Sequence, residues 1–325
     1  MTEGRSCPLA YRYRPEDLCK EPEPAEADVL YIVGGLYGNP LALDEIERMA
    51  WFEEQQGRRI RLVFNGDFNW FNAEDALFRD INTRVLQHTV SLGNVEYELA
   101  NPSDGAGCGC AYPDFVDQGV VNRSNRIMDR LQAVASRHSD LQEKLSDLPR
   151  YRCLFFGGLK VLVLHGDPES LAGWGLAHES FSGANTASDS GVVEQWLAAT
   201  GADVIACTHT CLPVLWGGQV DGRDRVVVNN GSAGMGNLKA DARGLVTRIA
   251  LAGPEYPGTP DDTLIEASLG AVCVSLQPVA FESDAWLQQF DRIWPDGSDA
   301  AVSYRQRLVQ GTALELGRVS FVSIS

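Results

Sequence analysis

Short apolar segments that end abruptly in glycine and polar residues restrict the fold of this chain more than any other feature. The segments at 28–33 (DVLYIV) and 61–65 (RLVFN) are almost continuously apolar, which is typical of strands buried on both faces of a sheet. Each is followed by a glycine-containing polar turn and then by apolar residues at helical spacing, at 41–52 and near 73–88. This alternation predicts an α/β fold whose sheet begins with parallel strands.

The second half of the chain reads differently. Segments 152–156 and 160–164 flank a Gly-Gly pair and predict a hairpin. Between the two halves of the chain we expect a long loop at 101–119 and one charged helix at 121–145. The remaining elements are strands within 203–213, 225–234, 244–251 and 271–279, and helices near 192–199 and 285–294. No element is predicted beyond 294.

We divide the chain into an N-terminal arm (1–27), a main domain (28–279) and a C-terminal extension (280–325). With 27 basic and 44 acidic residues the net charge is −17, which disfavours nucleic acid and anionic membranes as partners. No apolar run reaches the roughly 20 residues that cross a bilayer, and the polar N-terminus does not resemble a secretory signal. We therefore expect a cytoplasmic protein whose eight cysteines are free thiols or metal ligands rather than disulfides.

Four polar side chains stand at the ends of predicted strands. They are Asp67 in a Gly-Asp pair, Asn94 in a Gly-Asn pair, His165 before a glycine, and His209 in Thr-His-Thr. Loops at the carboxyl ends of strands in an open α/β sheet meet in one crevice, so these four should converge. A carboxylate, an amide oxygen and two imidazoles form a ligand set suited to Mn, Zn or Fe.

The order of these motifs resembles that of the calcineurin-like metallophosphoesterases. The matching segments cover about 28–250 and are GGLYGNPLAL (34–43), NGDFNW (65–70), GNVE (93–96), VLHGDP (163–168), THTCLP (208–213) and VVNNGSAG (227–234). The resemblance implies a four-layer sandwich of two mixed β-sheets with helices outside. It also implies hydrolysis of phosphoric esters at a pair of metal ions.

The departures from the family pattern fall on one of the two metals. Gly35, Tyr37 and Cys211 stand where that metal's own ligands are expected, whereas the other metal's set of Asp67, Asn94, His165 and His209 is complete. The resemblance therefore implies one divalent transition metal and an incomplete ligand set for a second metal. Tyr37 and Cys211 either build an altered second site or only pack and hydrogen-bond.

Two further departures concern the mechanism. Val95 replaces the family histidine that protonates the leaving oxygen, and Trp70 replaces a second aspartate. We expect a metal-dependent phosphoric ester hydrolase with a mononuclear or altered centre and a small phosphorylated substrate. The alternative is a metal- or ligand-binding protein on the same scaffold without hydrolytic activity; the lost groups favour it and the retained ligand set disfavours it.

Other residues are candidates for the rim of the crevice. Possible substrate contacts are Asn39, Arg123 and Arg126, although a surface salt bridge is the favoured role of each arginine. Residues expected in bordering loops are Trp70, Trp174, His178, Cys108 and Cys110. Trp174 either forms a wall for the substrate or anchors its own loop.

Overall fold

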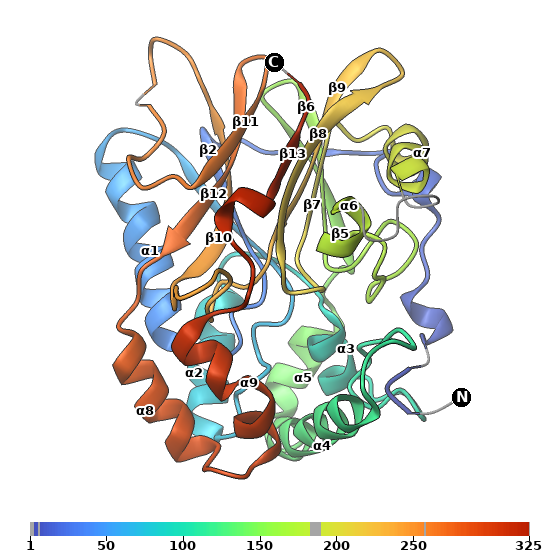
Figure 1. The fold of residues 1–325 in the computed structure, drawn as a ribbon, viewed down its shortest axis with the longest axis vertical. Helices are drawn as coiled ribbons and strands as arrows, with labels where there is room; N and C mark the ends of the chain where they lie inside the picture. Colours follow the sequence, from blue (N-terminus) through green and yellow to red (C-terminus); the bar gives the residue numbers. More distant parts are fainter. Residues whose placement is uncertain (1–2, 6, 183–189, 257, 325) are drawn as a thin grey trace.

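The computed structural model describes residues 3–5, 7–182, 190–256 and 258–324. In this part of the chain two β-sheets pack face to face, and helices cover the outer face of each (Figure 1). This confirms the predicted four-layer α/β sandwich. The helices are α1 (Pro40–Gln55), α2 (Asp75–Val85), α3 (Asn94–Ala100), α4 (Gln118–Ala135), α5 (Ser139–Ser146), α6 (His178–Phe181), α7 (Ser190–Thr200), α8 (Ser283–Ile293) and α9 (Asp299–Gln310).

Both sheets are mixed. The first contains six strands in the spatial order β11 (Ile265–Leu269), β12 (Val272–Val279), β10 (Gly244–Leu251), β2 (Val29–Val33), β3 (Ile60–Asn65) and β4 (Thr89–Ser91). The second contains seven, in the order β1 (Glu23–Pro24), β5 (Tyr151–Phe156), β6 (Leu159–Leu164), β7 (Val204–Cys207), β9 (Arg223–Asn230), β8 (Pro213–Val220) and β13 (Ser320–Val322). Strands β2, β3 and β4 run parallel, whereas β5 and β6 form the expected antiparallel hairpin. Strands β1, β8, β11 and β13 were not predicted.

The side chains of β2 explain why its sequence is apolar throughout. Successive side chains on a strand point to opposite faces of the sheet. Leu30 and Ile32 contribute to the core between the two sheets, whereas Val29, Tyr31 and Val33 contribute to the core under the outer helices. Strand β2 is therefore buried on both faces, as its sequence predicts.

The prediction of a single helix at 121–145 is wrong. The structure has two helices, α4 and α5, separated by residues 136–138. His138 leaves the helical conformation (φ −126°, ψ 59°), its ring packs on Phe78, and its Nε2 lies 2.8 Å from a carboxylate oxygen of Asp75. These contacts with α2 hold the break, and apolar periodicity does not reveal them.

Segments at both ends of the chain join the edges of the seven-stranded sheet. In the arm, β1 pairs with β5, and Cys19 is disulfide-bonded to Cys153. At the other edge β13 of the C-terminal extension pairs with β8, and α9 packs on α4. Residues 1, 2 and 6 of the arm and 325 of the extension lie outside the described residues. The division at 28 and 280 stays a prediction.

The expectation that the cysteines are unpaired is wrong for four of them. Cys19 and Cys153 form one disulfide and Cys108 and Cys110 another. The first bridge joins residues 134 positions apart that the fold brings together, whereas the second joins two cysteines only two positions apart. Because disulfides persist mainly in oxidising compartments, the cytoplasmic location stays a prediction. Across the described ranges, no helix has the length and apolar character needed to cross a bilayer.

Candidate metal centre

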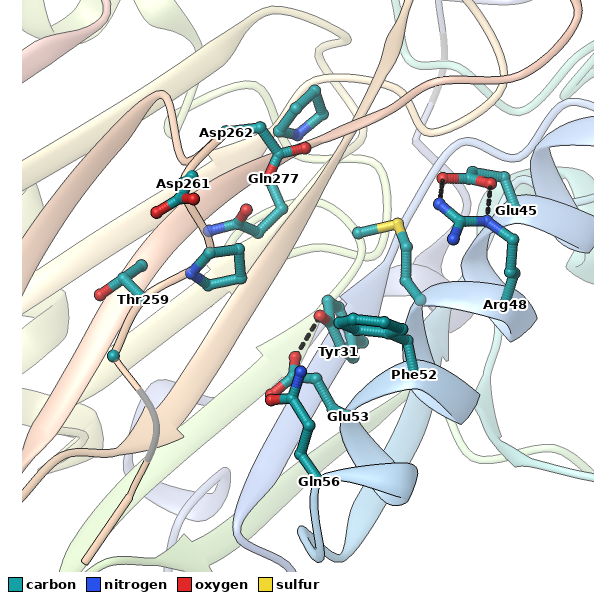
Figure 2. Close-up of a pocket in the computed structure, with 14 residues that line it drawn as sticks. Tyr31, Glu45, Arg48, Phe52, Glu53, Gln56, Thr259, Asp261, Asp262 and Gln277 are labelled. Atoms are coloured by element: carbon teal, nitrogen blue, oxygen red, sulfur yellow. Dashed lines mark hydrogen bonds and ion pairs between the residues drawn. The ribbon is translucent and has the colours of Figure 1, made fainter.

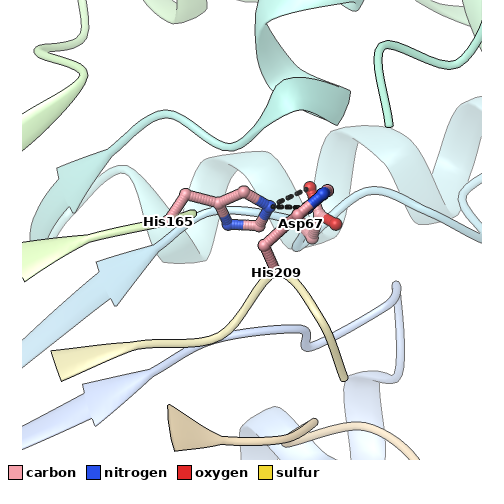
Figure 3. Close-up of side chains that lie close together, drawn as sticks. All are labelled: Asp67, His165 and His209. Carbon is pink, nitrogen blue, oxygen red and sulfur yellow. Dashed lines mark hydrogen bonds and ion pairs between the residues drawn. The ribbon is translucent and has the colours of Figure 1, made fainter. Parts of the chain in front are cut away.

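The structure brings Asp67, Asn94, His165 and His209 together where the two sheets meet. Asp67 follows β3 and Asn94 opens α3 just after β4, so both come from the six-stranded sheet. His165 and His209 follow β6 and β7 of the other sheet. All four side chains are buried, and ligand atoms of Asp67, His165 and His209 lie within 4.8 Å of one another (Figure 3). These residues could hold a metal ion.

The inward-facing atoms of the cluster converge on one imidazole nitrogen. His165 Nε2 lies 3.0 Å from Asn94 Oδ1, 3.1 Å from His209 Nδ1 and 3.3 Å from Asp67 Oδ1. Three acceptors share this single nitrogen, and among the described residues only Asp67 Oδ1 has a further donor, the Val95 N–H at 3.4 Å. A cation among the four atoms would satisfy them all at once, so the donor set fits a metal of the kind that binds mixed nitrogen and oxygen ligands.

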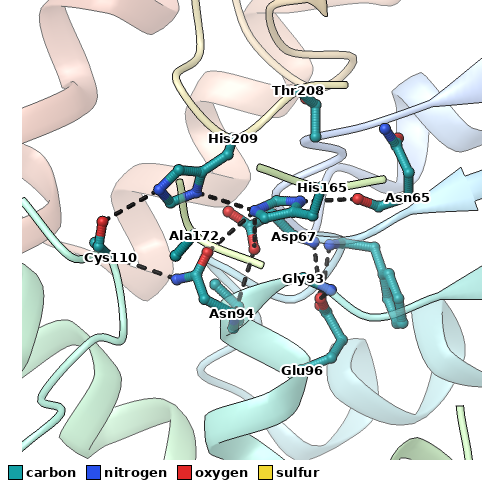
Figure 4. A network of polar contacts seen from close by, with 12 residues as sticks. Asn65, Asp67, Gly93, Asn94, Glu96, Cys110, His165, Ala172, Thr208 and His209 are labelled. Atoms are coloured by element: carbon teal, nitrogen blue, oxygen red, sulfur yellow. Dashed lines mark hydrogen bonds and ion pairs between the residues drawn. The ribbon is translucent and has the colours of Figure 1, made fainter. Parts of the chain in front are cut away.

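The outward-facing atom of each neutral ligand is held by a backbone carbonyl. His165 Nδ1 donates to Asn65 O at 2.8 Å, and His209 Nε2 donates to Cys110 O at 3.1 Å (Figure 4). Asn94 Nδ2 donates to Cys108 O at 3.0 Å. These bonds select the tautomers and the amide orientation that turn Nε2, Nδ1 and Oδ1 inward, which is how surrounding residues commonly orient metal ligands.

Glu96 holds the turn that carries Asp67. Its buried carboxylate accepts backbone N–H bonds from Asp67 (2.7 Å), Phe68 (3.0 Å), Asn69 (3.1 Å) and Gly93 (3.2 Å). Asp67 itself has φ 55°, a left-handed conformation that costs a non-glycine residue on the order of 1–3 kcal/mol. Glu96 therefore fixes an otherwise unfavourable turn. The GNVE motif (93–96) contains this glutamate, but the sequence alone did not indicate its role.

Glycine is required where the Asp67 turn meets the start of α3. A Cβ added to Gly66 would lie 2.3 Å from the backbone of Gly93 and 2.8 Å from His165 Nδ1. The φ of Gly66 is +95°, which also favours glycine. Close backbone contact between these two turns is what brings Asp67 beside Asn94.

The charges of the cluster are coupled. Burial raises the pKa of Asp67, but the neighbouring His165 and His209 outweigh this effect and hold the pKa below its usual value. Burial lowers the pKa of His165, and the Asp67 charge reverses this to a net rise. Burial and then the charge of His165 lower the pKa of His209 to about 3. His209 is therefore neutral, with Nδ1 free to bind a metal.

Tyr37 and Cys211 lie beside this cluster and bond to each other. Tyr37 Oη and Cys211 Sγ are 2.6 Å apart. Burial raises the pKa of both groups, so both are protonated at neutral pH and neither supplies an anionic ligand. Like Asp67, they adopt positive φ, at 53° and 62°. The two side chains therefore bond to each other, and the structure does not arrange them as a second set of metal ligands.

A cavity of about 180 Å³ opens next to the cluster. Asp67 and His209 line it on the metal side. Trp174 lines it as well; its Nε1 donates to Cys110 O at 2.9 Å, and its ring meets the His209 ring edge-on, so Trp174 both anchors its loop and forms a wall. The other lining residues are Tyr37, Trp70, Val95, Cys110, Tyr112, Thr210, Cys211, Tyr304 and Arg307.

Two lining residues, Tyr304 and Arg307, come from α9 and were missed from the sequence. The N-cap of this helix, Ser298, and the glycine after its last residue, Gly311, are start and stop signals that could have located the helix. No sequence signal shows that α9 reaches the cavity.

Four predicted rim residues have structural partners elsewhere. Asn39 is the N-cap of α1, where its Oδ1 accepts from two backbone N–H groups, and its Nδ2 donates to Gly234 O. Arg123 donates to Ser303 and Arg126 pairs with Asp299, both on α9. His178 Nε2 lies 2.8 Å from Arg318 O. None of the four is among the residues that line the cavity, and each is explained by packing between segments.

A second cavity of about 380 Å³ lies between α1 and the segment 258–262, away from the cluster (Figure 2). At its base Tyr31 donates to Glu53, which is also paired with Arg248 at 2.8 Å and with Arg58 at 3.1 Å. The Glu53 carboxylate is thus balanced by two arginines, although the buried Nε of Arg58 has no hydrogen-bond partner among the described residues. This cavity adds nothing to the metal centre.

The sandwich of two mixed sheets and the buried Asp-His-His cluster at the strand ends define the architecture of a metallophosphoesterase. No family model and no curated protein matches the chain by sequence. Among solved structures, a metallophosphoesterase from Sphaerobacter thermophilus matches with a TM-score of 0.53 and 16% identity, over 88% of this chain and 100% of that one. A hypothetical protein from Pyrococcus horikoshii OT3 matches with a TM-score of 0.55 and 14% identity, over 88% and 99%. The chain thus has the metallophosphoesterase fold.

Proposed function

We propose that the chain is a metal-dependent phosphoric ester hydrolase that uses one divalent transition metal, Mn, Zn or Fe. The observation that carries the proposal is the orientation of the ligands. Asn94, His165 and His209 each donate outward to a carbonyl, and their inward atoms converge with a carboxylate oxygen of Asp67. A cluster that only stabilised the fold would not leave hydrogen-bond acceptors facing one another, because buried acceptors are normally paired with donors.

The proposed chemistry divides between the metal and the chain. A metal at this centre supplies a Lewis acid for the phosphoryl group and makes water more acidic. The chain supplies the cavity beside it, with tyrosine side chains that burial keeps protonated and able to donate hydrogen bonds. Val95 lines this cavity and cannot transfer a proton. Substrates whose leaving group is already a weak base are therefore favoured.

A cavity of about 180 Å³ supports a small phosphorylated substrate rather than a macromolecule. Pockets for drug-sized ligands are larger, at about 300–1,000 Å³. Nucleic acid is also disfavoured by the net charge of −17.

A second candidate function is metal or ligand binding without hydrolysis on the same scaffold. It is favoured by Val95 at the position of a proton donor and by the mutual hydrogen bond of Tyr37 and Cys211. Both functions require the metal cluster. Turnover of an activated ester distinguishes them.

The test is hydrolysis of para-nitrophenyl phosphate and bis-para-nitrophenyl phosphate by protein loaded with Mn²⁺, Zn²⁺ or Fe²⁺. Elemental analysis of the same samples gives the metal content. We expect metal-dependent turnover that His165→Ala abolishes together with metal binding. His88→Ala is the matched control, because His88 is an exposed histidine outside the cluster. If the metal-loaded protein hydrolyses no activated ester, the result supports the second candidate function, metal or ligand binding without hydrolysis.

A further inference from the structure

We infer that Arg307 binds the substrate's phosphate opposite the metal and that the substrate is a dianionic phosphomonoester. This inference rests on the proposed function and adds the substrate class. Arg307 lies on α9 of the C-terminal extension and lines the same cavity as Asp67 and His209.

The guanidinium of Arg307 is fixed without being neutralised. Its Nε donates to Gly236 O at 2.7 Å, and its Nη2 donates to Cys211 O at 2.6 Å and to Asn237 Oδ1 at 3.1 Å. All three acceptors are uncharged. Arg305, two positions earlier on the same helix, instead pairs with the carboxylate of Asp291 at 2.8 Å. No ion pair of Arg307 is found within the described ranges.

A preoriented cation beside a cavity is suited to bind an anion. Nη1 of Arg307 has no protein partner in the described part of the chain, so the guanidinium retains donors for a ligand. Guanidinium groups recognise phosphate oxygens through paired, charge-assisted hydrogen bonds. In a chain with a net charge of −17, a positive group without an acidic partner at this cavity is suited to bind an anionic ligand.

The position of Arg307 is on the Cys211 side of the cavity. Its bond to Cys211 O places the guanidinium next to the Tyr37–Cys211 pair, whereas His165 and Asn94 lie beyond Asp67 and His209. A phosphate in the cavity would thus have the metal on one side and a fixed cation on the other. The charge that a second ion would supply comes here from a side chain.

The charges at the site match a dianion. Asp67 contributes −1, a divalent metal +2 and Arg307 +1, and these sum to +2; the other residues that line the cavity are aromatic, apolar or uncharged polar residues. A phosphomonoester carries close to two negative charges at neutral pH, whereas a diester carries one. Electrostatic complementarity therefore favours the monoester.

The test is the affinity of the Mn²⁺-loaded protein for inorganic phosphate, measured by calorimetry. Losing a charge-assisted hydrogen bond of this kind weakens binding by about 10- to 100-fold. We expect that loss in Arg307→Gln and a smaller loss of about 3- to 10-fold in Arg307→Lys, which keeps the charge but not the paired donors. Arg305→Gln, on the same helix, should bind phosphate like the wild type. Metal affinity should stay within about threefold in all variants.

The outcomes separate this inference from the proposed function. Wild-type affinity for phosphate in both Arg307 variants would overturn the role of Arg307, even if the wild type hydrolyses esters. Arg307-dependent phosphate binding without any turnover would support the inference and count against hydrolysis. If Arg307→Gln does not fold, Arg307→Lys decides. A KM for para-nitrophenyl phosphate that rises in Arg307→Lys while the diester KM stays unchanged would support the monoester specificity, and equal effects on both would overturn it.

Discussion

The backbone carbonyl of Cys110 lies 3.1 Å from Nε2 of His209 and accepts a hydrogen bond from its N–H. Two residues earlier, the carbonyl of Cys108 accepts from the amide of Asn94 at 3.0 Å. The disulfide between these cysteines thus closes a short loop whose carbonyls orient two of the four metal ligands. Neither cysteine needs to contact the metal to affect its binding.

The first prediction follows from this loop. Replacing Cys108 and Cys110 together by alanine should weaken metal binding by about 10- to 100-fold, the usual effect of removing groups that orient ligands. Calorimetric titration with Zn²⁺ or Mn²⁺ measures it. The control is Cys19→Ala with Cys153→Ala, which removes the other disulfide. That pair closes a separation of 134 residues and should cost about 2–5 kcal/mol of unfolding free energy with little effect on metal affinity.

Glu96→Gln is the second prediction. The carboxylate accepts four backbone N–H bonds around the Asp67 and Gly93 turns, and an amide would turn its own N–H₂ toward some of those donors. Unpaired buried donors cost about 1–3 kcal/mol each, so we expect a loss of about 2–4 kcal/mol in unfolding free energy and weaker metal binding. Urea unfolding and metal titration test it. Glu143→Gln, an exposed position on α5, is the control, and equal stability of the two variants would contradict the role of Glu96.

The fold and the ligand cluster could be predicted because local sequence encodes both. Buried strands such as β2 are apolar along their whole length, and the turn that ends each strand must carry its polar ligand at a fixed edge of the sheet. Asp67 and His165 are therefore recognisable from their own neighbours in the sequence.

The remaining parts of the site depend on contacts between distant segments. Arg307 lies 240 positions after Asp67, and only the packing of α9 brings it to the cavity. Arg123 and Arg126 were predicted as phosphate contacts because they are basic residues near the start of a helix. The packing of α9 on that helix instead places Ser303 and Asp299 beside them. Charge and spacing do not distinguish a cation that binds a ligand from one that holds two helices together.

The third prediction concerns the leaving group. General acid catalysis contributes about 10²- to 10⁴-fold in rate, and Val95 lines the cavity where a proton donor would act. Turnover of alkyl phosphates should therefore be at least about 100-fold slower than turnover of para-nitrophenyl phosphate. Steady-state kinetics on a series of leaving groups measures the dependence on leaving-group pKa. A flat dependence would show that another group donates the proton.

The fourth prediction is a stoichiometry of one metal per chain. Protonated Tyr37 and Cys211 are bonded to each other, and ionising either in its buried position opposes metal binding there. Cys211→Ser should leave the metal content and affinity nearly unchanged, whereas His209→Ala should abolish binding. Elemental analysis after dialysis measures both. Two metals per chain, or loss of metal in Cys211→Ser, would show that the cysteine has rebuilt a second site.

The last prediction is that pH acts in opposite directions on the metal-free fold and on metal binding. Burial lowers the pKa of His165, but the Asp67 charge raises it to a net value above the ordinary 6.5. A raised histidine pKa stabilises the fold below about pH 6.5, and this contribution is lost as pH rises through the folded-state pKa. Glu96 acts in the same direction, because burial and Asp67 raise its pKa to about 7 from 4.5. His209, whose pKa falls to about 3 in the folded protein, adds stability as pH rises to about 6.5 and offsets Glu96 there. The metal-free protein should therefore become less stable from about pH 6.5 to about pH 8.

Metal binding should strengthen over the same range, because a ligand nitrogen must lose its proton before it binds a cation. Below the raised pKa of His165, one proton should be released from this residue for each metal bound, and affinity should rise by up to about tenfold per pH unit. His209, with a pKa of about 3, releases none. Urea unfolding with chelator present and calorimetry in buffers of different ionisation enthalpy measure the two effects. Metal affinity that is independent of pH between about 5 and 7 would show that the proton on His165 Nε2 does not compete with the metal.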